Sequence, residues 1–67
     1  MASLDGLPAM QADAIKRVAQ RYKVSAESMQ VVVGCLGLPD GWASVSFEVG
    51  DGRWLAMGVS PEGAVHS

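Results

Sequence analysis

The chain has 67 residues, of which 49% are hydrophobic, and its formal net charge is −2 at pH 7. A chain of this length forms one domain with a small core, and its single cysteine, Cys35, excludes an internal disulfide. Cys35 and His66 are also too few soft or imidazole ligands for a structural zinc site. We therefore expect a single domain over 1–67 without a cofactor, stabilised by forming a homodimer.

Residues 8–22, PAMQADAIKRVAQRY, predict an amphipathic helix because they contain no internal proline or glycine and place apolar side chains at helical spacing. Pro8 suits the first turn, where its missing N–H is not required. Charges on such a helix commonly form a solvated face, but here they are concentrated. Four of the five cations of the chain lie in or directly after this segment: Lys16, Arg17, Arg21 and Lys23.

The next segment is compatible with two structures. Ser25 is a good N-cap, and Gly37 can take the left-handed conformation after a last helical turn, which together favour a helix over 26–36. The three consecutive valines at 31–33 favour a buried strand instead, because β-branched side chains suit a pleated sheet. We expect the helix over 26–36, with a strand over 29–36 as the open alternative.

The stretch AQRYKVSAESM, residues 19–29, resembles the helix-turn-helix motif of small bacterial repressors. The resemblance implies DNA binding with the second helix as the recognition helix. The stretch departs from the motif at Lys23, where glycine is common, and the side chains that would face the groove include an anion and no cation. A net charge of −2 also argues against a general nucleic-acid binder.

Residues 42–49 and 53–59 predict an antiparallel hairpin, followed by the turn SPEG at 60–63 and a short C-terminal strand. A three-residue loop over 50–52, with Gly52 left-handed in a G1 bulge, pairs positions of the same parity. All medium-sized aliphatic side chains then share one face. That face comprises Val45, Phe47, Val49, Leu55, Met57 and Val59. A two-residue loop would mix aliphatic and polar side chains on the same face, so we expect the three-residue loop.

The opposite face of the predicted hairpin carries both tryptophans of the chain among small side chains. Three interpretations stay open: the indoles pack under the second helix or the C-terminal tail, meet a symmetry mate in a dimer, or contact another macromolecule. The candidate partner-binding residues are Trp42, Ser44, Ser46 and Trp54.

No catalytic arrangement is evident in the sequence. A Cys35–His66 nucleophile pair would require a tail residue to be held firmly, and the carboxylates at turn positions have ordinary reasons to be there. No apolar run approaches the roughly 18 residues of a membrane span, and no signal peptide is evident, so we expect a cytoplasmic protein. We also expect the protein to come from a bacterium or a phage.

The sequence therefore predicts a small α+β domain with the order helix, helix, hairpin. Its expected function is that of a non-enzymatic interaction or regulatory module, homodimeric, that binds another protein through the tryptophan-bearing sheet face. The alternative is a helix-turn-helix-like nucleic-acid-binding regulator that uses the basic face of the first helix.

Overall fold

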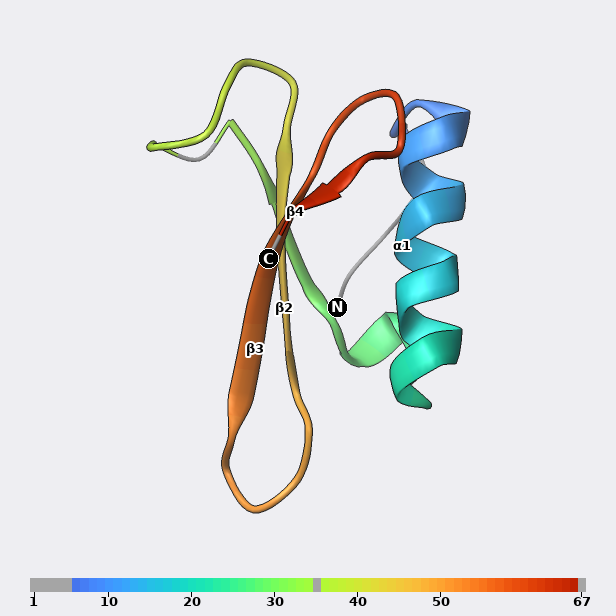
Figure 1. The fold of residues 1–67 in the computed structure, drawn as a ribbon, viewed down its shortest axis with the longest axis vertical. Coiled ribbons are helices and arrows are strands. Elements are labelled where there is room, and N and C mark those ends of the chain that lie inside the picture. The colour runs from blue at the N-terminus through green and yellow to red at the C-terminus, as the bar shows by residue number, and fades with distance from the viewer. Residues whose placement is uncertain (1–5, 35, 67) are drawn as a thin grey trace.

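The computed structural model describes residues 6–34 and 36–66. One helix precedes a four-stranded antiparallel sheet with strand order β1-β2-β3-β4 (Figure 1). The predicted α+β class is thus confirmed. The elements are α1 (Ala9–Tyr22), the 3₁₀ turn η1 (Ala26–Ser28), β1 (Gln30–Val33), β2 (Ala43–Glu48), β3 (Trp54–Val59) and β4 (Val65–His66).

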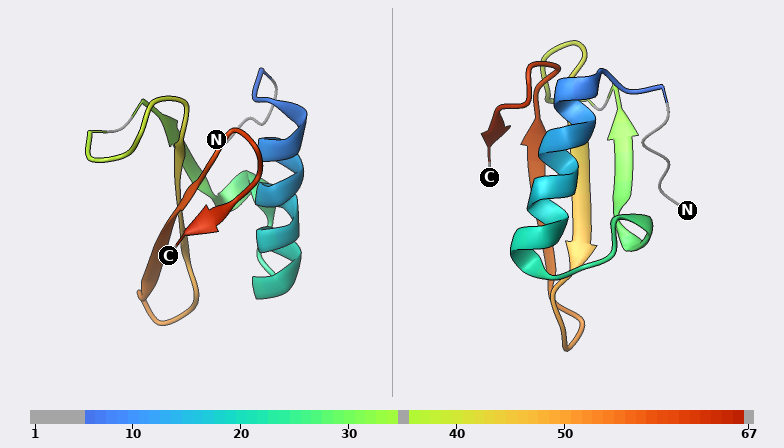
Figure 2. Two further views of the ribbon diagram at one scale, coloured as in Figure 1. Left: turned by 45° about the horizontal axis from the view of Figure 1, so that its top comes forward. Right: turned by 90° about the vertical axis from the view of Figure 1, so that its right-hand side faces the viewer.

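Helix α1 confirms the helix predicted over 8–22 and lies across one face of the sheet, in front of β2 and β3 (Figure 2). Its buried side chains lie on one side, as the apolar spacing required, and they pack on the sheet. The helix ends at Lys23, whose left-handed backbone (φ 56°) directs the chain back toward the sheet. The side chains that α1 buries are Gln11, Ala14, Ile15, Val18 and Ala19.

The helix predicted over 26–36 is wrong, and the alternative strand over 29–36 describes this segment better. The capping signal at Ser25 is real, since its Oγ accepts a hydrogen bond from the Glu27 N–H at 3.3 Å. The helix stops after the single turn η1, however, and β1 begins at Gln30. Val31 pairs with Val45 of β2 and packs against the core, so tertiary burial outweighs the local helix signals.

The hairpin register is the predicted same-parity register: Val45 lies opposite Met57 and Phe47 opposite Leu55. Val45 and Phe47 are fully buried beneath α1. Val49 and Leu55 lie on the same aliphatic face but are 40% and 37% exposed. The reason is geometric, because the β2–β3 turn extends beyond the end of α1 (Figure 1).

The loop of this hairpin differs from the prediction in one detail. Asp51 and Gly52 both have positive φ, and the Arg53 N–H donates to the Gly50 carbonyl at 2.9 Å, as in a type I′ turn. The Val49 N–H also donates to the Arg53 carbonyl, at 2.8 Å. The extra residue that keeps the parity is therefore Gly50, and the G1 bulge predicted at Gly52 is wrong.

Gln11 joins α1 to the end of the sheet where β2 begins and β3 ends. The side chain is fully buried, and its Nε2 donates to the Gly41 and Val59 carbonyls at 3.0 Å each. These two bonds hold the helix above Val59, while the Oε1 atom has no hydrogen-bond partner in the part of the chain that the structure describes. The position and tilt of α1 thus depend on a polar anchor as well as on apolar packing.

The predicted SPEG turn at 60–63 and the short strand after it are both confirmed. The Ala64 N–H donates to the Oγ of Ser60 at 2.9 Å, and Ser60 and Ala64 also pair through their backbones. Gly63 has φ 91° and approaches α1 closely: a Cβ there would lie 2.9 Å from the Met10 carbonyl oxygen. Glycine at position 63 therefore lets the turn pass close to the helix without strain or a clash, which places β4 beside α1.

A matched pair of glycine substitutions tests this contact. Gly37 has a similar left-handed backbone (φ 93°), but a Cβ added there would meet no atom within 4 Å. We expect Gly37→Ala to cost about 1 kcal/mol of unfolding free energy, from backbone strain alone. Gly63→Ala should cost more, about 2 to 3 kcal/mol, because the clash adds to the strain. Urea unfolding measures both, and equal losses would contradict the close approach.

Candidate functional site

The face of the sheet turned away from α1, called here the outer face, has no helix over it within the described residues (Figure 2). Strand pleating and the register place alternate residues of each strand on this face. Trp42 precedes β2 with the same parity, so it extends the face at one end. The strand residues of the outer face are Gln30, Val32, Ser44, Ser46, Glu48, Trp54, Ala56, Gly58 and His66.

Trp42 closes one end of the outer face. Its ring lies over Gly58, where a Cβ would come within 3.2 Å of the indole Cε3 and 3.4 Å of Leu38 Cδ2. The imidazole of His66 packs against the same indole, with ring centroids 5.2 Å apart and a tilt of 50°. For Trp42 the interpretation of packing against the C-terminal segment therefore holds, and the indole is half-buried.

Trp54 stands at the other end of the outer face and is 54% exposed. It pairs with Glu48, six positions along β2 from Trp42, which corresponds to roughly 20 Å at the rise of a strand. The structure therefore does not bring the two tryptophans together. Of the two indoles, only Trp54 offers a large open apolar surface.

Small side chains form the floor between these ends. Ser44 and Ser46 are half-buried, and their hydroxyls have no hydrogen-bond partner among residues 6–34 and 36–66. Val32 of β1 lies beside Ser44 and is 54% exposed. The outer face is thus a floor of small side chains that carries two hydroxyls, with Val32 on one side and Trp54 at one end, and it suits apolar contact and hydrogen bonding.

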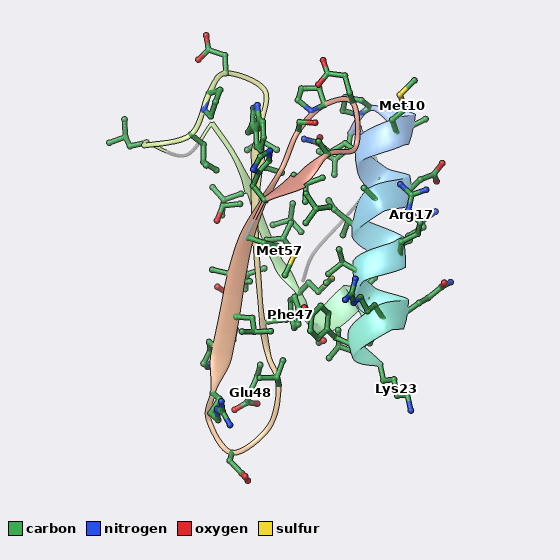
Figure 3. The ribbon with its side chains drawn as sticks, viewed as in Figure 1. Met10, Arg17, Lys23, Phe47, Glu48 and Met57 are labelled. Atoms are coloured by element: carbon green, nitrogen blue, oxygen red, sulfur yellow. The ribbon has the colours of Figure 1, made fainter. Side chains whose placement is uncertain are left out.

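The four predicted cations are all exposed but do not form one patch. Arg17 and Arg21 are one helical turn apart and lie along the same side of α1, whereas Lys16 is about 100° around the helix from Arg17. Lys23 extends from the end of α1 away from the sheet (Figure 3). Trp54 is on the opposite side of the sheet from α1, so the cations and the open indole lie on different faces of the sheet.

Arg17 and Arg21 lie close to residues of the sheet that the sequence analysis did not associate with them. They line an open groove of about 510 Å³ between α1 and the β3–β4 edge of the sheet. Figure 3 shows Met57 extending from β3 toward α1. The groove exists because β4 is only two residues long and leaves most of β3 uncovered, which no local pattern indicated. Its other lining residues are Ala14, Val18, Tyr22, Met57 and Val65.

The residues relevant to catalysis, metal binding and membrane insertion are placed as follows in the described chain. His66 lies in β4, and the prediction for Cys35 falls outside the described residues. Among residues 6–34 and 36–66, no three histidine, cysteine or acidic side chains come together to hold a metal ion. In the same part of the chain, no helix has the length and apolar character needed to cross a bilayer.

Comparisons of the chain with family models, with curated proteins and with solved structures found no match. The function proposed below therefore depends on the geometry of this chain alone.

The packing of Trp42 on Gly58 can be tested with Gly58→Ala in a Trp54→Phe background, where Trp42 is the only indole. The backbone of Gly58 accepts alanine, but the new methyl must displace the ring. We expect a red shift of the Trp42 emission and a loss of about 1 kcal/mol of stability. An unchanged spectrum would show that the indole does not lie on Gly58. Ala56→Gly, on the same strand and face, serves as the control.

Proposed function

We propose that this protein is a small non-catalytic interaction module that binds another protein through the outer face of its sheet. One observation carries the proposal: α1 covers one face, while the other face presents Trp54 and Val32, each about half exposed. Tryptophan is enriched among the residues that dominate binding energy, and partly exposed apolar groups around small side chains are common at docking surfaces.

The polar character of the outer face supports a protein partner. The hydroxyls of Ser44 and Ser46 and the carboxylate of Glu48 lie among the apolar groups, as in the mixed surfaces of non-obligate complexes. Glu48 faces Trp54 across the hairpin, so an anion stands beside the open indole. This arrangement disfavours a phosphate backbone at that end of the face.

The alternative function, a helix-turn-helix-like regulator, requires a recognition helix in the second segment. Residues 30–33 form a strand instead, so this alternative is disfavoured. Of its basic residues, Arg17 and Arg21 share one side of α1, Lys16 lies elsewhere around the helix, and Lys23 follows the end of the helix, so the four do not form one basic face. The homodimer stays a prediction. The outer face measures roughly 20 Å by 20 Å from strand spacing and rise, about 400 Å², against the ~800 Å² per partner of a standard interface. A dimer would therefore need contacts beyond this face.

Replacement of Trp54 by serine tests the proposal. Because the indole is exposed, we expect Trp54→Ser to change the unfolding free energy by no more than about 0.5 kcal/mol. Partner binding should weaken by about 2 kcal/mol, or roughly 30-fold, as for a binding hot spot. The matched control is Val49→Ser, which removes an apolar side chain of comparable exposure from the other face.

The measurement compares proteins captured quantitatively by the wild-type chain, by Trp54→Ser and by Val49→Ser. The proposal expects at least one protein that wild type and Val49→Ser retain and Trp54→Ser loses, with exchange protection of the outer face in the purified complex. If every captured protein is retained equally by the two variants, or if Trp54→Ser unfolds the chain, the proposal is wrong.

A further inference from the structure

Strand β3 has a free edge beside the groove described above. β4 pairs only with Gly58 and Val59, so on the side away from β2 residues 54–57 have no strand next to them among residues 6–34 and 36–66. In Figure 2 the lower part of β3 forms the margin of the sheet below β4, with α1 in front of it. An uncovered edge offers main-chain donors and acceptors to another strand.

The hydrogen bonds of the hairpin show which groups this edge offers. The Val49 N–H donates to the Arg53 carbonyl, and antiparallel pairing alternates from there, so Leu55, Met57 and Val59 bond to β2. The residues between them direct their N–H and C=O groups outward. Gly58 uses its groups with β4, which leaves those of Trp54 and Ala56 for an incoming strand.

The side chains of the groove determine which kind of strand would fit beside this edge. The helix side carries Arg17 and Arg21, both exposed and without an ion pair among the described residues. The floor is apolar, with Met57 from β3 and Val65 from β4. β4 itself shows how a strand lies here, since Val65 pairs with Val59 and enters the groove.

We propose that the free edge of β3 binds an extended acidic segment of the partner protein, added to the sheet in line with β4. The segment would exchange hydrogen bonds with Trp54 and Ala56, and its side chains opposite Leu55 and Met57 would carry carboxylates to Arg17 and Arg21. This inference rests on the proposed function and names the docking mode and the chemistry of the partner.

The two surfaces of the molecule meet at this strand. Side chains of an added strand alternate, so those opposite Trp54 and Ala56 lie on the outer face and those opposite Leu55 and Met57 lie in the groove. One extended segment would thus contact the indole and the guanidinium groups together. This larger footprint also relieves the shortage of area on the outer face alone.

A synthetic strand provides the probe: a capped heptapeptide of alternating valine and glutamate, with a valine–lysine peptide as its charge control. Isotope-labelled protein is titrated with each peptide and followed by amide chemical shifts. We expect the glutamate peptide to bind, with the largest shifts at Trp54, Ala56, Arg17 and Arg21. The lysine peptide should bind at least about tenfold more weakly, because like charges meet in the groove.

Two double variants with the same change in charge separate the groove from general electrostatics. Arg17→Glu/Arg21→Glu alters the groove, whereas Lys16→Glu/Lys23→Glu alters cations elsewhere on or after α1. The first should weaken the glutamate peptide at least about tenfold and should bind the lysine peptide in its place. The second should change either affinity by less than about threefold at ~0.15 M salt, since screening limits distant charges.

The pairing itself is tested by N-methylation of the peptide. Because an added strand bonds to β3 only at alternate residues, methylation of the valine amides should abolish binding while methylation of the glutamate amides should not. This test leaves the protein unchanged, so it is independent of any folding defect in the variants.

The outcomes also distinguish this inference from the proposed function. If Trp54→Ser loses the natural partner while the peptides bind equally or the two methylation series behave alike, the outer face binds the partner and the edge inference is wrong. If Arg17→Glu/Arg21→Glu exchanges the glutamate peptide for the lysine peptide but Trp54→Ser retains the partner, the groove binds an acidic strand and the proposed role of the outer face is wrong. Binding of an oligothymidylate in preference to the glutamate peptide, lost in the Arg17→Glu/Arg21→Glu variant, would overturn the acidic segment as the ligand.

Discussion

One constraint governs the rest of the structure: a single helix of 14 residues can cover only one face of a four-stranded sheet. Ile15 and Val18 of α1 belong to one buried cluster with Val45, Phe47 and Val59 of the sheet, and this cluster between the helix and the sheet is the core of the described chain. Gln11 adds a directional anchor by bonding to two backbone carbonyls. The free energy of folding therefore comes from one side of the sheet, and the other side is left to solvent or to a partner.

The small size of the domain also leaves part of one sheet edge without a neighbouring strand among the described residues. β4 consists of two residues, and the other four residues of its partner strand β3 have no neighbouring strand on that side in the described chain. Small proteins commonly protect such an edge with a charge, a proline or a bulge. Here the edge lies beside a groove lined by two arginines and a methionine, and the proposed acidic strand would complement that charge. The open face and the open edge share β3, so the two surfaces are continuous.

Particular residues show how far the sequence could predict this arrangement. The spacing of Ile15, Val18 and Ala19 predicted α1, and the loop at 50–52 predicted which face of the hairpin turns toward the core. The segment after Ser25 failed because its capping signals are real but end after one turn, while pairing of Val31 with Val45 decides the rest. Of the candidate site residues, Trp54 is open and Trp42 is packed against Gly58 and His66, a difference that the sequence left undecided.

The sequence by itself determined the elements whose causes are local: the amphipathic helix, the turns with glycine and proline, and the alternation that sends aliphatic and indole side chains to opposite faces. Only the tertiary structure decided whether residues 30–33 join the sheet, which tryptophan is covered, and that Arg17 and Arg21 border the free edge of β3. The physical reason is that these outcomes depend on pairing and packing between residues far apart in the chain. Periodicity and capping record the environment of a residue within one element, and they contain no information on how far a neighbouring strand extends.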